Sequence, residues 1–433
     1  MKFHSTNNHD LKVDLRQAVT EGLAPDNGLY MPDRIDPLPD DFFGTFHNLS
    51  FQEIAFQVAR QIIGKDIPEK DLRVIVDHAV QFDAPLVPVD DNMFALELFH
   101  GPTMAFKDFG ARFMSQLLGY FARQQNREIV ILVATSGDTG SAVANGFLGV
   151  AGINVVVLYP SGKVSDIQEK QFTTLGQNIT ALEVDGTFDD CQRMVKQAFL
   201  DETLRKQYFL TSANSINIAR LIPQSFYYFY AVSRAGKPDR PVVFSVPSGN
   251  FGNLTAGLLA KRMGLPVKKF IAATNVNDVV PEYLRTRAFN PRPSRQTISN
   301  AMDVGDPSNF SRMLDLFGHD HAALAASVQG CGFTDEETRA AMRHVFATTS
   351  YILDPHGAVG YLGLKRYQRD DGESTGIFLE TAHPAKFKDT VEQTLGTVVA
   401  IPPGLRKFMA GEKKSVRLQN NLEALRDYLV RTL

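Results

Sequence analysis

The sequence predicts an α/β fold in which parallel sheets carry helices on both faces. Short apolar runs rich in β-branched residues recur along the chain, and helix-length segments separate them. Runs of this kind are typical of strands buried on both faces, and their alternation with helices is typical of parallel sheets. A chain of 433 residues is also long enough to divide into more than one domain.

Residues 1–98 differ from this pattern, and we expect them to form a separate N-terminal domain. Glycines and prolines mark turns between residues 22 and 32, and apolar spacing predicts an amphipathic helix over residues 50–63. The proline-containing segment 84–89 (APLVPV) is typical of an extended connector.

The strand–helix alternation begins after residue 99. We expect a large domain from residues 99–128 and 222–400, a small α/β domain from residues 129–221, and a C-terminal extension over residues 401–433. A polar, proline-containing loop is predicted over residues 285–300, and the last helix over 419–433. The predicted strands are 129–135 (IVILVAT), 153–159 (INVVVLY), 179–184 (ITALEV), 242–247 (VVFSVP), 270–274 (FIAAT) and 376–380 (GIFLE).

Composition excludes several classes of protein. The net charge is −3, and no basic stripe with interleaved aromatic residues predicts a nucleic-acid surface. No apolar run is long enough to span a membrane, and the first residues lack the apolar core of a signal peptide, so we expect a cytoplasmic protein. Cys191 and Cys331 form no CxxC pair, and His319 and His321 lack a third ligand, so no metal site is expected.

One lysine occupies an unusual position in the segment HGPTMAFKDFGARFM (residues 100–114). Gly101 and Pro102 prevent a helix there, and the spacing of the following phenylalanines predicts that a helix begins near Lys107 or Asp108. The positive end of the helix dipole and desolvation would both lower the pKa of the Lys107 amine, as covalent amine catalysis requires. An ordinary surface lysine beside a helix start remains the alternative.

Two glycine-containing loops follow predicted strands and precede predicted helices. They are residues 136–139 (SGDT) and 248–253 (SGNFGN). Backbone N–H groups at such a junction form an anion site, most often for phosphate, although a turn without a ligand is the alternative. Neither loop has the P-loop pattern.

Two further segments carry polar side chains of chemical interest. Residues 212–220 (SANSINIAR) end on Arg220, whose planar fork suits a phosphate, although an ordinary helix cap by Asn or Ser is equally open. Residues 381–388 (TAHPAKFK) follow the last predicted strand, which places Thr381 at a carboxyl end where ligands bind in α/β sheets. There, His383 is either a base or a structural hydrogen-bonding group.

Together, these five segments in this order resemble the threonine synthase family, within the tryptophan-synthase-like group (fold type II) of pyridoxal-phosphate enzymes. The resemblance extends from about residue 22 to about residue 396. It implies two parallel-sheet domains with helices on both faces plus an N-terminal domain, and pyridoxal 5'-phosphate (PLP) as the cofactor. By position, it implies that Lys107 carries the cofactor as a Schiff base and that Thr381 meets its pyridine nitrogen.

The same resemblance implies the remaining site residues. The cofactor phosphate would be held by Ser248, Gly249, Asn250, Phe251, Gly252 and Asn253. The substrate carboxylate or the ring face would meet Ser136, Asp138 and Thr139. The substrate phosphate would meet Asn214, Ser215 and Arg220.

The implied reaction converts O-phospho-L-homoserine and water to L-threonine and phosphate, the last step of threonine biosynthesis. A dehydratase or a phospholyase of the same fold is one alternative, and Arg220 disfavours the former because it suits a phosphorylated substrate. A non-catalytic phosphate- or nucleotide-binding protein is the alternative from another class. We expect a small-molecule substrate, no nucleic-acid or membrane partner, and a monomer, since no extra regulatory domain is evident.

Overall fold

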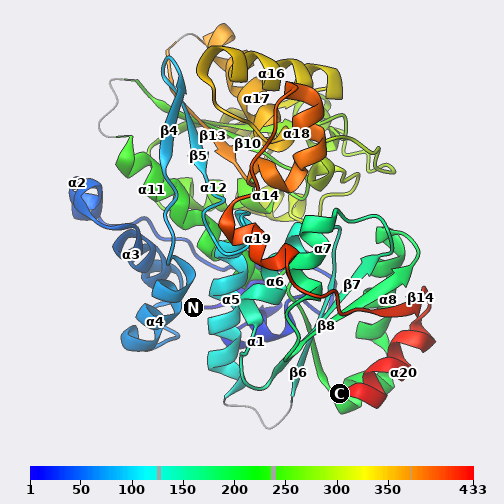
Figure 1. Cartoon of the computed structure of the whole chain (residues 1–433). Coiled ribbons are helices and arrows are strands. Elements are labelled where there is room, and N and C mark those ends of the chain that lie inside the picture. The colour runs from blue at the N-terminus through cyan, green and yellow to red at the C-terminus, as the bar shows by residue number, and fades with distance from the viewer. Residues whose placement is uncertain (124–127, 236–239, 372) are drawn as a thin grey trace.

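The computed structural model describes residues 1–123, 128–235, 240–371 and 373–433. In this part of the chain the strands form three sheets. A six-stranded and a five-stranded sheet lie in separate halves of the molecule, and a three-stranded sheet belongs to the N-terminal segment (Figure 1). Helices cover both faces of the two large sheets, as the strand–helix alternation predicts.

The six-stranded sheet has the order β12-β11-β10-β13-β5-β4, and all its strand pairs are parallel except β4 with β5. Alternate residues point to opposite faces, so Val243 and Ile271 pack with helix α17, whereas Phe244 and Phe270 pack with α12. The strands are β4 (Leu86–Asp90), β5 (Met93–Glu97), β10 (Val242–Pro247), β11 (Val267–Thr274), β12 (Val328–Gly332) and β13 (Thr375–Glu380). The helices of this half are α11 (Phe226–Arg234), α12 (Gly252–Arg262), α13 (Val279–Thr286), α14 (Phe310–Leu316), α15 (His321–Ser327), α16 (Asp335–Thr349), α17 (Pro355–Asp371) and α18 (Lys388–Leu395), with 3-10 turns η3 (Asn300–Met302) and η4 (Pro384–Phe387).

The five-stranded sheet has the order β14-β8-β7-β6-β9 and is parallel throughout. One face packs Val130 and Leu132 against α8 and α20, and the other packs Ile131 and Val133 into a core shared with α5 and α6. The strands are β6 (Ile129–Ala134), β7 (Ile153–Pro160), β8 (Ile179–Asp185), β9 (Phe209–Ser212) and β14 (Val416–Gln419). The helices are α6 (Asp138–Phe147), α7 (Asp166–Thr173), α8 (Phe188–Leu200), α9 (Glu202–Gln207) and α20 (Leu422–Thr432).

Helix α5 (Lys107–Ala122) joins the two halves, because its apolar side chains belong to a core that contains residues of both large sheets. The helix begins at Lys107, as the phenylalanine spacing predicts. It packs against α4, α6, α10 (Ile218–Leu221) and η2 (Ile222–Ser225). Helix α19 (Pro403–Met409) connects the two halves a second time, through its contact with α7.

The N-terminal segment forms the antiparallel sheet β2-β1-β3 and a group of helices that pack into the same core. Helix α3 matches the expected amphipathic helix, and Ser50 caps it by accepting from the N–H of Glu53. The elements are β1 (Phe3–Ser5), β2 (Lys12–Val13), β3 (Tyr30–Pro32), α1 (Leu15–Glu21), α2 (Asp40–Thr45), η1 (Phe46–Asn48), α3 (Phe51–Ile63) and α4 (Glu69–Ala79).

Several segments differ from the sequence-based expectation. Strands β5, β9 and β12 of the two large sheets are not among the predicted strands. The connector 84–89 contributes β4, an edge strand that tolerates Pro88 because an edge position leaves N–H groups unpaired. Residues 416–419 form β14, which pairs with β8, so the last helix begins at Leu422 rather than at Gln419. The domain boundaries remain a prediction, although β4 and β5 join the sheet of the large domain and β14 joins that of the small one.

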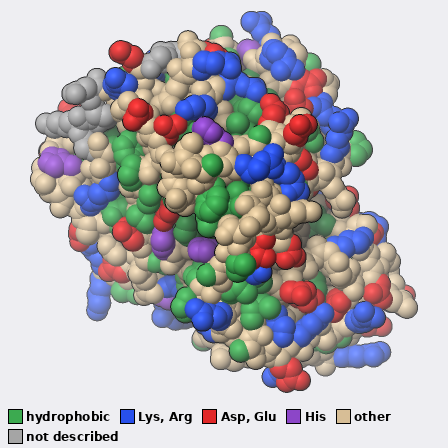
Figure 2. All heavy atoms as spheres, turned by 45° about the horizontal axis from the view of Figure 1, so that its top comes forward, with side chains coloured by type: hydrophobic (Ala, Val, Ile, Leu, Met, Phe, Trp, Pro, Cys, Tyr) green, Lys and Arg blue, Asp and Glu red, His purple; other side chains and the backbone are tan. Residues whose placement is uncertain are grey.

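The surface is mixed in charge. On the face shown in Figure 2, basic and acidic side chains are interspersed, in line with the small net charge of −3. Cys191 and Cys331 are both buried and form no disulfide. Of the helices that the structure describes, none combines the length and the apolar character needed to cross a membrane.

Candidate active site

The predicted site segments lie at the carboxyl ends of adjacent parallel strands. In the six-stranded sheet, the loop 248–253 follows β10 and Thr381 follows the neighbouring β13. In the five-stranded sheet, residues 136–139 follow β6 and residues 212–220 follow or end the neighbouring β9. Carboxyl ends of parallel strands are where α/β folds bind ligands, so the fold gathers four of the five predicted segments at two such edges.

The fifth segment, at the start of α5, meets one of these edges. The backbone N–H of Phe106 donates to the carbonyl of Thr381 at 2.8 Å, and Ala105 bridges Ala382. Asp108 fixes the preceding turn, because its carboxylate accepts from the N–H and the hydroxyl of Thr103 at 2.8 and 2.7 Å. The turn therefore holds Lys107 beside the strand end that carries Thr381.

The Lys107 amine lies in a mostly buried, charged environment. Its side chain retains 19% exposure, and its Nζ lies 4.0 Å from the Asp138 carboxylate. Desolvation lowers the pKa of the amine, the Asp138 charge opposes that effect, and the Lys386 and Arg220 charges lower the pKa further. The amine therefore loses its proton more readily than an exposed lysine does.

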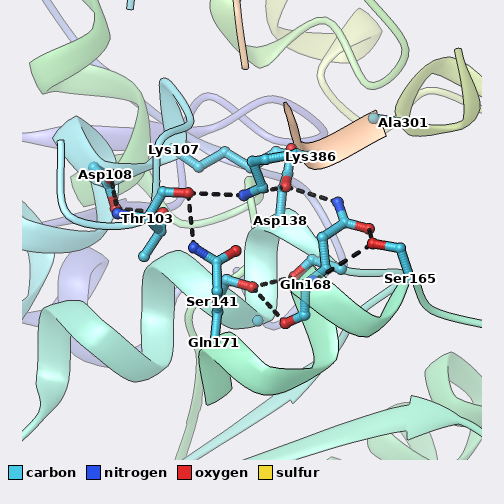
Figure 3. A network of polar contacts seen from close by, with 12 residues as sticks. Thr103, Lys107, Asp108, Asp138, Ser141, Ser165, Gln168, Gln171, Ala301 and Lys386 are labelled. Atoms are coloured by element: carbon cyan, nitrogen blue, oxygen red, sulfur yellow. Dashed lines mark hydrogen bonds and ion pairs between the residues drawn. The ribbon is translucent and has the colours of Figure 1, made fainter. Parts of the chain in front are cut away.

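Asp138 is bound by a second lysine that the sequence reasoning missed. Lys386, which is 1% exposed, pairs with Asp138 at 2.6 Å, and Gln168 donates to the same carboxylate oxygen at 2.8 Å (Figure 3). Burial alone would raise the pKa of Asp138, but the Lys386 and Lys107 charges outweigh it and lower that pKa. Asp138 is thus an ionised acceptor between two lysines.

Lys386 is itself held in place by the turn before α5. Its ammonium donates to the carbonyl of Thr103 at 2.9 Å, and Gln171 of α7 donates to the same carbonyl at 2.9 Å (Figure 3). Lys386 stands within the segment 381–388, but no local pattern separates a buried lysine from a surface one. Its role depends on a contact with α6, which is far away in the sequence.

The loop 248–253 is closed by its own side chains. Ser248 donates to the side-chain oxygen of Asn253 at 2.7 Å, and the Asn253 amide donates to the carbonyl of Pro247 at 2.9 Å. Phe251 has a positive φ of 59° and precedes α12, which begins at Gly252. At Gly249 an added Cβ would lie 2.7 Å from the Ala301 carbonyl oxygen, so the backbone approaches closely there.

The loop 212–220 contacts the loop 248–253. Asn250 donates to the Ser215 hydroxyl at 2.5 Å, and Asn309 donates to the same hydroxyl at 3.3 Å. Arg312 of α14, fully buried and also missed by the sequence reasoning, donates to the carbonyls of Ser215 and Ile216 at 3.1 and 2.7 Å. The loops 212–220 and 248–253 are therefore parts of one hydrogen-bonded network.

Two buried polar atoms in the loop 212–220 have no hydrogen-bond partner among the described residues. They are the Oδ1 of Asn214 and the Nε of Arg220. Arg220 is 3% exposed and donates to the carbonyl of Ala213 at 2.6 Å, and burial lowers its pKa to about 10, which leaves it charged at neutral pH. Unsatisfied buried atoms are rare in native structures, and a bound ligand is one reason for them.

The remaining predicted residues have simpler surroundings. Ser136 and Thr139 are half-buried at the start of α6. Asn217, rather than Asn214 or Ser215, caps α10. His383 accepts from the N–H of Ala385 and caps η4, and burial lowers its pKa to about 4, so the geometry agrees with the structural alternative for this histidine.

These residues fit pyridoxal phosphate. The cofactor needs an amine for its aldehyde, donors for its phosphate and a partner for its ring nitrogen. Lys107 offers a desolvated amine, the start of the eleven-residue α12 offers backbone N–H groups beside Gly249, and Thr381 offers a hydroxyl next to the strand end.

Comparisons with known proteins point the same way. A family model described as "Pyridoxal-phosphate dependent enzyme" matches residues 83–379, "Threonine synthase N terminus" matches residues 2–80, and "Threonine synthase, C-terminal" matches residues 357–429. The chain is 45% identical to the threonine synthase of Haemophilus influenzae over the full length of both chains. It is 45% identical to that of Escherichia coli, with 98% of this chain and 97% of the relative covered.

Solved structures agree with the sequence comparisons. The crystal structure of threonine synthase from Escherichia coli matches with a TM-score of 0.93, at 44% identity and full coverage of both chains. A PLP-bound threonine synthase from Brucella melitensis also matches with a TM-score of 0.93, at 36% identity, over 100% of this chain and 99% of that one. The chain belongs to the threonine synthase family of pyridoxal-phosphate-dependent enzymes, with the type II fold.

Proposed function

We propose that this chain converts O-phospho-L-homoserine and water to L-threonine and phosphate in a PLP-dependent reaction. The observation that carries the proposal is the position of the Lys107 amine, between the strand end bearing Thr381 and the charged group formed by Asp138 and Lys386. Membership of the threonine synthase family supports it.

The chemistry requires one base that acts several times in a turnover. When bound, PLP supplies the electron sink that stabilises negative charge developing at the substrate Cα. We propose that Lys107 takes the Cα proton and later returns it. Its lowered pKa suits both tasks, because a base works best when its pKa lies near the operating pH.

The carboxyl edge of the six-stranded sheet would bind the cofactor. We propose that residues 248–253 hold the cofactor phosphate through backbone N–H groups at the start of α12, and that the Thr381 hydroxyl meets the pyridine nitrogen. The side-chain oxygen of Asn253 accepts from the Ser248 hydroxyl and from the N–H of Leu254, which supports this assignment because both bonds fix the loop before any ligand arrives.

The carboxyl edge of the five-stranded sheet would bind the substrate. We propose that Arg220, Asn214 and Ser215 hold the phosphate that leaves from Cγ. The phosphate would accept from the unpartnered Arg220 Nε, and the Asn214 amide N–H and the Ser215 hydroxyl would be further donors. Ser136 and Thr139 would donate to the substrate carboxylate. Asp138 would act through the two lysines rather than on the substrate, because an ionised carboxylate would repel one.

A phospholyase would stop once phosphate has left, whereas the proposed reaction needs water to add at Cβ. We also propose the domain division given above, a cytoplasmic location and a monomeric state. Size-exclusion chromatography would check the monomeric state.

The test is an assay of purified holoenzyme with O-phospho-L-homoserine, in which phosphate and threonine are both measured. We expect equal amounts of the two products. Lys107→Ala should lower the rate by at least about 10²- to 10⁴-fold, the usual contribution of a positioned base, while the thermal unfolding temperature stays similar. Release of 2-oxobutyrate instead of threonine would contradict the proposed reaction, and a fully active Lys107→Ala would contradict the assigned base.

A further inference from the structure

Two histidines and one aspartate meet at a point that the proposed reaction does not use. His4 lies on β1, His9 lies in the turn between β1 and β2, and Asp315 lies on α14. The Nε2 of His4 lies 3.1 Å from both carboxylate oxygens of Asp315, and the Nε2 of His9 lies 2.7 Å from one of them. One ligand atom from each residue falls within 4.8 Å of the others.

The ligand set suits zinc. Two imidazole nitrogens and one carboxylate oxygen, with a water in the fourth position, are a common set for Zn²⁺. Bonds of about 2.0–2.2 Å in a tetrahedron place the ligand atoms roughly 3.3 Å apart. The His4–Asp315 distance is already close to that value, and the His9 side chain is 60% exposed, so it can retreat from 2.7 Å.

The Nδ1 of His4 is buried and has no hydrogen-bond partner among the described residues, although the Asp33 carboxylate lies 3.6 Å away. A neutral imidazole that donates from Nε2 to Asp315 has only a lone pair to turn toward Asp33. A metal on Nε2 moves the proton to Nδ1, which then faces Asp33.

Such a carboxylate behind a ligating histidine is a recurrent feature of metal sites, because it fixes the tautomer and the ring orientation. Asp33 is in turn held by Lys12 at 2.8 Å. We propose that His4, His9 and Asp315 form a zinc-binding site, with Asp33 orienting His4.

The site would have a structural consequence. It would tie β1 and its following turn to α14, which carries the buried Arg312. Arg312 donates to the carbonyls of Tyr30, Ser215 and Ile216. Zinc at this point would therefore stabilise the packing of the N-terminal sheet against the loop 212–220. The proposal does not depend on which substrate that loop binds.

The test is isothermal titration of dialysed, tag-free holoenzyme with Zn²⁺, because a histidine tag would itself bind the ion. We expect one site per chain in the unaltered protein and its loss in His9→Ala, a variant that should fold because His9 is exposed. Asp33→Asn should weaken binding by about 10- to 100-fold, the usual effect of losing an orienting carboxylate. His47→Ala, an exposed histidine on η1 outside the cluster, is the matched control and should bind as the unaltered protein does.

Two further measurements complete the test. Zinc should raise the thermal unfolding temperature of the unaltered protein and of His47→Ala, but not of His9→Ala. X-ray absorption of the bound ion should show two imidazole ligands. No binding by the unaltered protein would overturn the proposal. Equal binding by His9→Ala, or several weak sites lost piecemeal, would overturn it as adventitious surface binding.

Discussion

The loops 248–253 and 212–220 follow strands of different sheets and touch each other. They differ in how many of their polar side-chain atoms have hydrogen-bond partners within the protein. In the first loop, the side chains of Ser248, Asn250 and Asn253 all form hydrogen bonds within the protein. In the second, Asn214 and Arg220 each keep a buried polar atom without a partner.

Under the proposed assignment, the first loop holds a cofactor that stays and the second a substrate group that leaves. A loop that is complete before binding suits a cofactor that stays, because little has to rearrange. A loop with unsatisfied polar atoms suits a group that arrives and leaves, because each visit satisfies atoms that are otherwise costly to bury. The Asp138–Lys386 ion pair connects the two sides, since Asp138 lies on α6 of the five-stranded half and Lys386 lies on η4 of the six-stranded half.

The largest expected effect comes from breaking that charged pair with Lys386→Met. Removing one partner of a buried ion pair costs about 3–5 kcal/mol in the free energy of unfolding. Asp138 has a lowered pKa in the folded state, so its contribution is complete above the ordinary pKa of a carboxyl and is lost as the pH falls. Urea unfolding should therefore show the full loss at pH 7 and a smaller one in acid.

Lys388→Met provides the control for that measurement. Lys388 pairs with Glu392 one helical turn away in a more exposed setting, so its loss should cost no more than about 0.5 kcal/mol. A difference between unaltered protein and Lys386→Met that stays constant with pH would show that the Asp138 charge is not what Lys386 stabilises.

Arg220→Lys tests the loop 212–220, which we propose holds the substrate phosphate. A lysine cannot reproduce the planar fork, so kcat/KM for the phosphorylated substrate should fall by about 10- to 100-fold, the equivalent of one charged hydrogen bond. The affinity for PLP, measured by absorbance titration of the cofactor-free enzyme, should change little. A parallel loss of cofactor affinity would show that the two loops do not divide the ligands in this way.

Gly249→Ala tests the loop 248–253, which we propose holds the cofactor phosphate. The added carbon would lie 2.7 Å from the Ala301 carbonyl oxygen and from the Met302 Cα, both backbone atoms that cannot step aside cheaply. Crowding of this kind costs about 1–3 kcal/mol, which should appear mainly as weaker PLP binding. Gly252→Ala, whose added carbon meets its nearest atom at 3.5 Å, should have the smaller effect.

The smallest effect concerns the contact between the two loops. A double-mutant cycle with Asn250→Ala and Ser215→Ala should give a coupling energy of about 0.5–1.5 kcal/mol in the free energy of unfolding, the net value of one hydrogen bond. A coupling near zero would mean that the loops are adjacent but independent.

The sequence predicts the buried parts of the fold better than its edges. Strands such as β6 and β10 are continuous apolar runs because both their faces are covered, and their bounds agree with the expectation within a residue. All four edge strands of the large sheets, β4, β9, β12 and β14, are missed as strands, and so is the interior strand β5. Strands β4 and β14 are short and partly exposed, and β14 is mostly polar. Each therefore forms only because a neighbouring strand is present.

The site shows the same limit. Lys107 is predictable because its signal is local: a lysine where a helix begins. Lys386 and Arg312 are not, since each is buried by contacts with segments far away in the sequence, and nothing nearby distinguishes them from surface residues. Asp138 was visible in the sequence, but its counterion was not, and the counterion decides what the carboxylate does.

The pairing of β14 with β8 has a consequence for biosynthesis. The ribosome makes residues 179–185 long before residues 416–419, so the outer edge of β8 stays open while most of the chain is translated. Open strand edges invite pairing with other chains. The nascent protein therefore passes through a stage with an open strand edge, and a premature stop before residue 416 would make this exposure, with its risk of aggregation, permanent.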